Sequence, residues 1–402
     1  MKKTFAKILC IALVVIMAVT CFAACGGSKN YAENNTTIKI GVSGPLTGAA
    51  AIYGTSVRNA AQLAVDEINA AGGFKGVMLE LIPLDDKHDP ANVAANYASM
   101  YENGMQISLG CVTTKPGLEF KELSKADNVF FLTPSASADN IPEYSNGYQM
   151  CFADSNQGSA SAEYFNANYA GKKIGVFYKA DDDYSKGIYN KFKATLDASK
   201  FSGALVEASF LGDASTFDSQ IQLLKDCDVI FMPIYYTPAS QFMSQAKTTV
   251  KANAIYYGCD GLDGIDAIEG FDINSIPQEV SYLSHFNSNA TSGPAKELID
   301  KYNARFDEKK EPLNQFGAAA YDCVYAIYEA MKVADENGKT VTATTHPSEV
   351  CDILTEVFNG DFTFRGVTGE CKDGQKSYIS WESNGYVNKV AIKYIVKEAD
   401  AE

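Results

Sequence analysis

Along most of this chain, short continuous runs of hydrophobic residues alternate with segments in which hydrophobic residues recur at the spacing of a helix. An apolar run from Ile38 to Val42 is followed by a turn rich in glycine and proline, and the next apolar residues recur at helical spacing. They are Val57, Ala60, Ala61, Ala64 and Ile68. Gly72 and Gly73 predict the end of this helix, because glycine readily adopts the positive φ found at helix C-termini. With a second apolar run from Val77 to Leu84, the segment is predicted to form a β-α-β unit.

The same alternation continues through the chain and predicts an α/β fold. Nine apolar runs are predicted as strands: Ile38 to Val42, Val77 to Leu84, Ile107 to Val112, Val129 to Leu132, Lys173 to Tyr178, Ala204 to Phe210, Val229 to Pro233, Ala254 to Tyr257 and Glu279 to Ser284. Helical segments between strands are typical of parallel sheets covered on both faces. The length suits two lobes. We therefore expect two Rossmann-like lobes joined by a hinge, with a ligand in the cleft at the carboxyl ends of the strands.

Polar segments indicate where the chain passes between the lobes. The segment from Asp154 to Gly158 is predicted to be the first crossing, and the chain is expected to return after Ser284 through helices over 295–308 and 316–334. Strand pairs and the final crossings are expected in the C-terminal part. The predicted N-terminal lobe is residues 37–153 with 285–370, and the predicted C-terminal lobe is residues 154–284 with 371–402.

Residues 1–24 have the pattern of a secretion signal. Lysines precede an apolar stretch over 8–20, and small residues then lead to Cys25. This looks like a bacterial lipoprotein cleavage site, so we expect a lipidated, palmitate-bearing Cys25 and a flexible tether over 25–36. A transmembrane anchor is an alternative, but about thirteen apolar residues are fewer than the roughly 20 that a span needs; cleavage without a lipid is another. The expected location is extracytoplasmic, on the outer face of the cell membrane.

Charge and cysteine content exclude some classes of function. The formal net charge is −15, and no basic stripe offsets it, so nucleic acid is not expected as a partner. Seven cysteines remain after Cys25: Cys111, Cys151, Cys227, Cys259, Cys323, Cys351 and Cys371. None forms a Cys-x-x-Cys motif, and most lie in apolar patterns where cysteine behaves as a small buried hydrophobe. Cys351 and Cys371 are candidates for a disulfide.

Two loops at predicted strand ends carry hydroxyl groups. Thr114 follows Val112 and precedes a predicted helix, whose free backbone N–H groups could hold a carboxylate. Ser135 and Ser137 follow the next strand and can donate to the same carboxylate or accept from an ammonium. The alternative is that these hydroxyls only cap helices.

A third loop carries a carboxylate, and aromatic residues follow several other strands. Asp260 lies beside Gly261 at a strand end and is a candidate partner for a buried ammonium, although an Asp-Gly pair is often only a turn. Four aromatic side chains could close over a ligand, with packing as the alternative for each: Tyr53, Tyr184, Tyr235 and Phe316.

The segments from Gly41 to Gly48 and from Asp66 to Gly73 resemble the opening of the leucine/isoleucine/valine-binding family of type I periplasmic solute-binding proteins. The resemblance extends over essentially the whole mature chain. It implies a two-lobed clamshell that holds an amino acid with seven residues: Thr114, Ser135, Ala136, Ser137, Tyr184, Tyr235 and Asp260. Tyr53, Val112 and Phe316 would then shape the side-chain pocket. The chain departs from the family at His88 and Thr113, where the best-known amino-acid binders carry a disulfide.

The resemblance implies the solute-binding lipoprotein of an ABC importer, which delivers an amino acid, most readily an apolar one, to transmembrane permease subunits. The alternatives are a ligand-sensing receptor subunit, or a binder of another solute such as an amide or an aromatic acid. We expect a monomer without a cofactor and without enzyme activity, because catalytic and phosphate-binding motifs are missing from the sequence. His88 with Asp85, Asp86 and Asp89 could ligate a metal, but local pairing at a strand end is favoured. Likewise the run Asp181–Asp183 lacks the spacing of a calcium loop.

Overall fold

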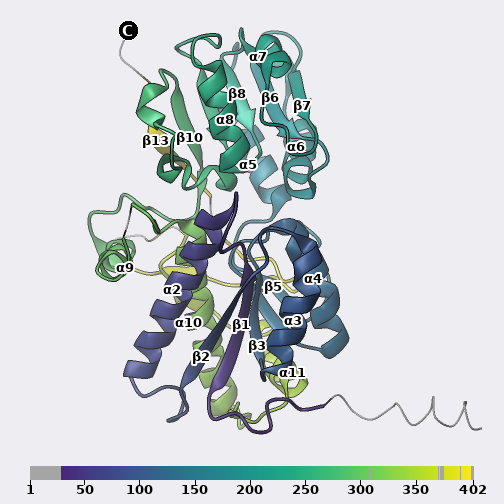
Figure 1. The fold of residues 1–402 in the computed structure, drawn as a ribbon, viewed down its shortest axis with the longest axis vertical. Coiled ribbons are helices and arrows are strands. Elements are labelled where there is room, and N and C mark those ends of the chain that lie inside the picture. The colour runs from purple at the N-terminus through teal and green to yellow at the C-terminus, as the bar shows by residue number, and fades with distance from the viewer. Residues whose placement is uncertain (1–28, 308, 370, 372–374, 390, 400–402) are drawn as a thin grey trace, which may run out of the picture.

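A computed structural model describes residues 29–307, 309–369, 371, 375–389 and 391–399. In this part of the chain two α/β lobes are stacked along the long axis of the molecule (Figure 1). The α/β fold predicted from the alternating pattern is therefore confirmed. The secretion signal over 1–24 and the lipidated Cys25 lie outside the described residues. None of the helices in the described ranges has the length and hydrophobicity needed to cross a bilayer.

The first lobe is built on a parallel sheet with the strand order β2-β1-β3-β4-β5. Its strands are β1 (Ile38–Gly44), β2 (Leu79–Asp85), β3 (Ile107–Cys111), β4 (Phe130–Thr133) and β5 (Gly147–Gln149). Ile40 pairs with Leu81 on one side and with Ile107 on the other, so apolar side chains meet across the three central strands at this level. The sequence did not predict β5, which is only three residues long.

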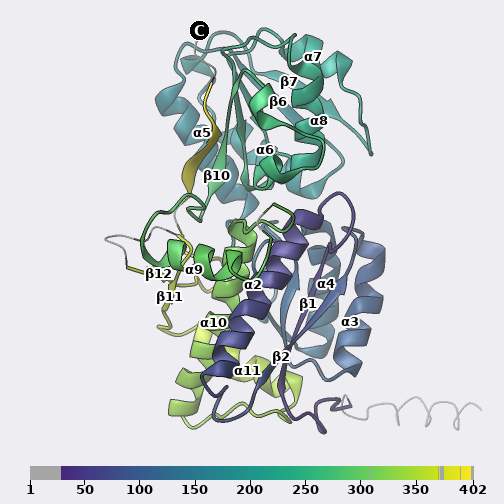
Figure 2. The same ribbon diagram turned by 60° about the vertical axis from the view of Figure 1, so that its left-hand side comes forward.

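Helices cover both faces of this sheet (Figure 2). They are α2 (Ala51–Ala70), α3 (Val93–Glu102), α4 (Thr114–Asp127), α10 (Gln315–Glu336) and α11 (Pro347–Phe358). Apolar residues of α2, α10 and α11 share one core cluster, and those of α3 and α4 form another on the opposite face. Helix α9 (Gly293–Asn303) lies beside the hinge.

The second lobe has a six-stranded sheet with the order β13-β10-β9-β8-β6-β7. Its strands are β6 (Ile174–Lys179), β7 (Val206–Phe210), β8 (Val229–Met232), β9 (Ile255–Gly258), β10 (Glu279–Ser284) and β13 (Ile392–Lys397). Only β13 is antiparallel to its neighbour. The covering helices are α5 (Asp154–Asn168), α6 (Asp183–Thr195), α7 (Asp218–Leu224) and α8 (Tyr236–Ala246).

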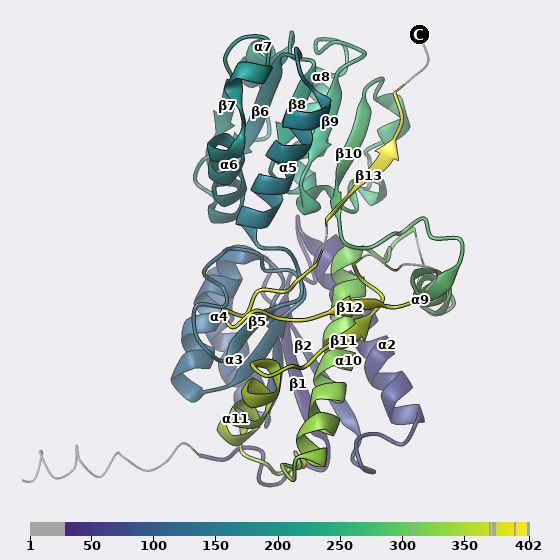
Figure 3. The same cartoon turned by 180° about the vertical axis from the view of Figure 1, so that it is seen from behind.

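The crossings between the lobes differ in two respects from the prediction. The polar segment from Asp154 to Gly158 is the start of α5, and the chain crosses just before it. At the C-terminus the predicted change of lobe at residue 371 is too early. The hairpin of β11 (Phe364–Gly366) and β12 (Ser377–Ile379) packs beside α10 in the first lobe, and only β13 joins the second sheet (Figure 3). Apolar pattern alone does not show which lobe a short strand joins.

Lys389, in the last segment that crosses between the lobes, contacts Met150, in the first crossing segment. Its buried Nζ donates to the carbonyl oxygen of Met150 at 2.7 Å and to Oγ1 of Thr368 at 2.5 Å. Burial lowers the pKa of this ammonium to about 8. The hinge strands are therefore joined by a polar contact inside the protein.

The described part of the predicted tether, residues 29–36, packs on the first lobe. Ala32 is fully buried, the ring of Tyr31 lies edge-on to Tyr101 with centroids 5.7 Å apart, and Nδ2 of Asn35 donates to the carbonyl of Gly104 at 2.8 Å. The prediction of a flexible tether was wrong here, because a polar composition does not reveal tertiary contacts.

The seven cysteines after Cys25 are free thiols in the described residues. The candidate disulfide between Cys351 and Cys371 is not formed. Sγ of Cys351 lies 3.4 Å from Oδ1 of Asn128, whereas Sγ of Cys371 lies 3.5 Å from the carbonyl oxygen of Val367. The two thiols thus contact different parts of the first lobe.

Candidate functional site

A small cavity lies between the two lobes, where loops leave the carboxyl ends of their strands. It is lined by Tyr53, Val112, Thr113, Thr114, Ser135, Ser137, Tyr184, Tyr235, Asp260, Gly261 and Phe316. Its open space is only about 10 Å³, which does not exceed the volume needed for one water molecule. The lobes are therefore closed on each other.

Nine of the ten predicted ligand-binding residues line this one cavity. The exception is Ala136, whose side chain packs in the core cluster beneath α4 instead. Thr113 and Gly261 line the cavity as well, although the sequence analysis did not select them. Parallel sheets bring the carboxyl ends of their strands to one edge, which explains why loops far apart in sequence meet here.

The first-lobe wall combines hydroxyl-bearing residues with a helix N-terminus. Thr113 and Thr114 lie at the N-terminus of α4, where the first backbone N–H groups have no partner within the helix and the helix dipole is positive. Thr113 does not cap the helix with its side chain. Ser135 and Ser137 lie in a non-helical loop after β4, so the helix-capping alternative does not apply to them. Two threonines and two serines thus line one small space beside a helix N-terminus.

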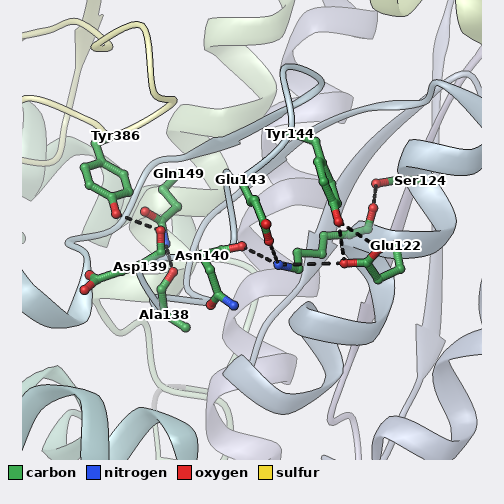
Figure 4. A network of polar contacts seen from close by, with 10 residues as sticks. Glu122, Ser124, Ala138, Asp139, Asn140, Glu143, Tyr144, Gln149 and Tyr386 are labelled. Atoms are coloured by element: carbon green, nitrogen blue, oxygen red, sulfur yellow. Dashed lines mark hydrogen bonds and ion pairs between the residues drawn. The ribbon is translucent and has the colours of Figure 1, made fainter.

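Polar contacts hold the serine loop in place. Nε2 of Gln149 donates to the carbonyl oxygens of Ala136 and Ala138 at 3.0 and 3.1 Å. Figure 4 shows how the network continues along the following segment, where the hydroxyl of Tyr386 donates to the carbonyl of Asp139 at 2.7 Å. Glu143, in the same segment, forms an ion pair with the buried Lys121. The backbone on both sides of Ser137 is therefore held by side-chain hydrogen bonds.

The second-lobe wall contains a buried carboxylate. Asp260 is 2% exposed and begins a short 3₁₀ turn after β9. Its Oδ1 accepts a hydrogen bond from the Tyr184 hydroxyl at 2.5 Å, and its backbone N–H donates to Oε1 of Gln157 at 3.1 Å. Burial raises the pKa of Asp260 to about 7, although the bond from Tyr184 opposes that shift. Asp260 is therefore more than an ordinary turn residue.

A second buried carboxylate was missed from the sequence. Asp154 is 2% exposed, and burial raises its pKa well above the usual range, with the nearby charge of Asp260 adding to the shift. Within the described residues, Oδ1 of Asp154 and Nε2 of Gln157 have no hydrogen-bond partner. Both side chains come from the first turn of α5, at positions that share one helix face. The sequence feature that could have pointed to Asp154 and Gln157 is their position in a polar segment at the start of a helix, next to a crossing between the lobes.

Aromatic rings make up most of the remaining wall. The ring of Tyr235 stacks on Tyr184 with centroids 4.5 Å apart, and Tyr53 lies edge-on to Phe316 at 5.1 Å. The hydroxyl of Tyr53, in the first lobe, donates to the carbonyl oxygen of Gly261, in the second, at 2.5 Å. This bond joins the lobes directly across the cavity.

The candidate metal site around His88 is not formed. No cluster of three or more His, Cys, Asp or Glu residues with metal-binding geometry is found in the described ranges. Asp85 and Asp86 instead accept hydrogen bonds from nearby backbone N–H and hydroxyl groups, as expected for local pairing.

The cavity therefore has hydroxyl-bearing residues and a helix N-terminus on one side and the buried carboxyl group of Asp260 on the other, with aromatic rings in the remaining wall. Such an arrangement can hold a small molecule that carries both a carboxylate and an ammonium group.

Comparisons with known proteins identify the family and the fold of this chain. A family model described as periplasmic binding protein matches residues 37–372. The Leu/Ile/Val-binding protein BraC3 of Rhizobium johnstonii is 28% identical over 362 residues, which cover 87% of this chain and 93% of that protein. The branched-chain amino acid transporter substrate binding protein LivJ from Streptococcus pneumoniae, solved in complex with isoleucine, is 25% identical with a TM-score of 0.74, covering 90% of this chain and 98% of LivJ.

The same fold also occurs in proteins with a different ligand. An ABC transporter solute binding protein from R. palustris, solved in complex with benzoate, is 14% identical with a TM-score of 0.73 and covers 90% of this chain and 93% of its own. At that identity the likeness shows the fold alone. The fold by itself therefore does not decide which solute is bound.

Proposed function

The chain belongs to the periplasmic binding protein family, and from this premise we propose that it binds a free α-amino acid with an apolar side chain and delivers it to the transmembrane subunits of an ABC importer. Its family role is solute binding outside the cytoplasm and not catalysis. The ligand would lie in the cavity between the lobes, and closing of the lobes would retain it.

The pair of buried carboxylates is the observation that carries this proposal. Within the described residues, neither Asp154 nor Asp260 has a cationic partner, and burial raises the pKa of both. An unpaired charge in a closed cleft is costly, so the site favours a ligand that brings its own positive charge. An α-ammonium group supplies that charge, whereas benzoate and other aromatic acids do not.

The opposite wall supports the carboxylate half of the proposal. Thr114 lies at the N-terminus of α4, and Ser135 and Ser137 face the same cavity. Free N–H groups and hydroxyls stabilise an anion there. The apolar and aromatic side chains of Val112, Tyr53 and Phe316 are left to contact the ligand side chain, which favours an aliphatic or aromatic amino acid.

A lipid anchor at Cys25 completes the proposal. Two acyl chains would hold the protein at the outer face of the membrane. We also propose that the protein acts as a monomer, because a single chain supplies the residues of both cavity walls. Mass spectrometry of the mature N-terminus after expression in a lipoprotein-processing host would show the acyl chains.

The test is thermal unfolding of residues 29–402 with each common amino acid, with benzoate and with simple amides. A ligand at 100 times its Kd adds roughly 2.7 kcal/mol to the free energy of unfolding, which raises the Tm measurably. We expect a rise with leucine, isoleucine or valine and none with benzoate. A rise with benzoate alone would contradict an ammonium-binding site.

The affinity should depend on pH in a defined direction. Asp260 must be ionised to pair with an ammonium, and burial raises its pKa to about 7 in the unliganded protein. As the pH rises from about 5 to about 8, the ionised fraction increases and binding should tighten, by up to about tenfold per pH unit below pH 7. Calorimetry in buffers of different ionisation enthalpy should also show proton release on binding below pH 7. An affinity that is constant over this range would contradict the assignment.

A further inference from the structure

The loop after β2 has a strained backbone at two successive residues. Lys87 and His88 have φ of 58° and 61°, which non-glycine residues seldom adopt. The loop is held by its own carboxylates: Oδ1 of Asp85 accepts from the N–H of Lys87, and Oδ1 of Asp86 from the N–H of His88, both at 2.9 Å. Oδ2 of Asp86 also accepts from the Ser43 hydroxyl at 3.0 Å. Strain of this kind persists where surrounding contacts enforce it, and ligand clamps are a frequent location.

The strained conformation directs the imidazole of His88 to a residue of the binding cavity. Nδ1 of His88 lies 2.8 Å from Oγ1 of Thr113. Thr113 lines the cavity and precedes α4, yet its hydroxyl does not cap that helix. The contact with His88 thus takes the place of the cap.

The same imidazole contacts the other lobe. Its ring lies nearly perpendicular to the ring of Tyr235, at 82° with centroids 5.2 Å apart. Tyr235 in turn stacks on Tyr184, whose hydroxyl donates to Asp260. A continuous set of contacts therefore runs from Thr113 on the first-lobe wall to Asp260 on the opposite wall.

Its surroundings favour the neutral form of the imidazole. Burial lowers the pKa of His88, and the charges of Lys179 and Lys115 act in the same direction, while those of Asp182 and Asp213 oppose them. A neutral ring can share one hydrogen bond with Thr113 and present its edge or face to Tyr235 without the cost of burying a charge.

We propose that His88 is a positioning residue for closure of the cleft: it holds Thr113 through Nδ1, and its ring adds a contact with Tyr235 that is made only when the lobes close. The inference rests on the proposed function, because the closure that it favours is closure around a ligand. Loss of the ring would then leave the first lobe intact and destabilise the closed, ligand-retaining state.

The test compares His88→Asn with the parent. Asparagine tolerates positive φ and places an amide close to the position of Nδ1, so the contact with Thr113 can be kept while the ring is lost. With L-leucine as the probe, we expect about three- to tenfold weaker binding, the range of an aromatic edge contact, caused by faster dissociation in stopped-flow measurements. Lys87→Asn, at the exposed neighbour with the same φ, should leave affinity and dissociation unchanged.

A double-mutant cycle separates this role from general packing. If the ring acts through Tyr235, the variant that combines His88→Asn with Tyr235→Leu should bind leucine no more weakly than Tyr235→Leu alone. Additive losses, or a His88→Asn protein that releases leucine at the parent rate, would overturn the inference.

Failure of the proposed function would be seen separately, as a parent protein that does not bind leucine. The inference would then be judged on the unliganded protein by small-angle X-ray scattering. A larger radius of gyration for His88→Asn than for the parent would support it, because the closed form would be less populated. Equal radii would overturn it.

Discussion

Replacing Asp260 by asparagine should weaken amino-acid binding by at least about 30-fold. The substitution keeps the size of the side chain and can still accept a hydrogen bond from Tyr184, but it removes the charge. Removing one partner of a buried charge pair costs about 2–5 kcal/mol or more, since the other charge is left without compensation. Here the uncompensated charge would be the ammonium of the ligand.

Calorimetric titration with leucine, isoleucine and valine would measure the loss, and thermal unfolding without ligand would report on the fold. Because burial already raises the pKa of Asp260 to about 7, the neutral asparagine should not lower the Tm. Glu269→Gln is the matched control, since it removes an exposed carboxylate from the loops that follow β9. Asp260→Asn binding at the parent affinity would place the ammonium elsewhere in the cavity.

Replacing Gly261 by alanine should also greatly reduce binding, for a steric reason. A Cβ atom at this position would lie 2.5 Å from the hydroxyl oxygen of Tyr184 and 2.7 Å from the carbonyl oxygen of Ile234. The backbone carbonyl cannot move easily, so the turn that carries Asp260 must shift. The shift would disturb the bonds from Tyr184 to Asp260 and from Tyr53 to the Gly261 carbonyl.

We expect at least about tenfold weaker binding for Gly261→Ala and a lower Tm, because overpacking a close-packed site costs about 1–3 kcal/mol. Gly270→Ala is the control, because it introduces backbone strain without a steric clash. Gly270 has a positive φ, but a Cβ atom added there would have no neighbour within 4 Å. This control should lower the Tm slightly and leave the affinity unchanged. If Gly261→Ala binds as tightly as the parent, the close approach of Tyr184 to this turn is not needed for binding.

The regular part of the fold was predictable because its signals are local. The nine predicted strand runs correspond to β1–β4 and β6–β10, and the long apolar pattern over 316–334 is α10. Each element buries a continuous apolar run or stripe, which is visible in the sequence as a period. The short strand β5, the β11–β12 hairpin and the packed segment 29–36 have no such period, and they were missed or misplaced.

The polar part of the site was predictable where a hydroxyl or carboxyl side chain follows a predicted strand, and the apolar and aromatic part followed from the resemblance to the family. Thr114, Ser135, Ser137 and Asp260 met that condition, and all four line the cavity. Asp154 did not, because the polar segment that contains it gave no sign that its carboxylate is buried. Burial of a polar side chain depends on what the other lobe places over it, and that information is not local.

By itself, the amino-acid sequence determined the α/β class, the two lobes and the loops that carry ligand-binding chemistry, because periodicity and turn residues are properties of neighbouring positions. Tertiary structure alone decided that these loops meet in one closed cavity, that Asp154 is buried close enough to the cavity residue Asp260 to feel its charge, and that His88 links Thr113 to Tyr235. Those relations join residues 25 to more than 140 positions apart, and only the packing of one lobe against the other brings them into contact.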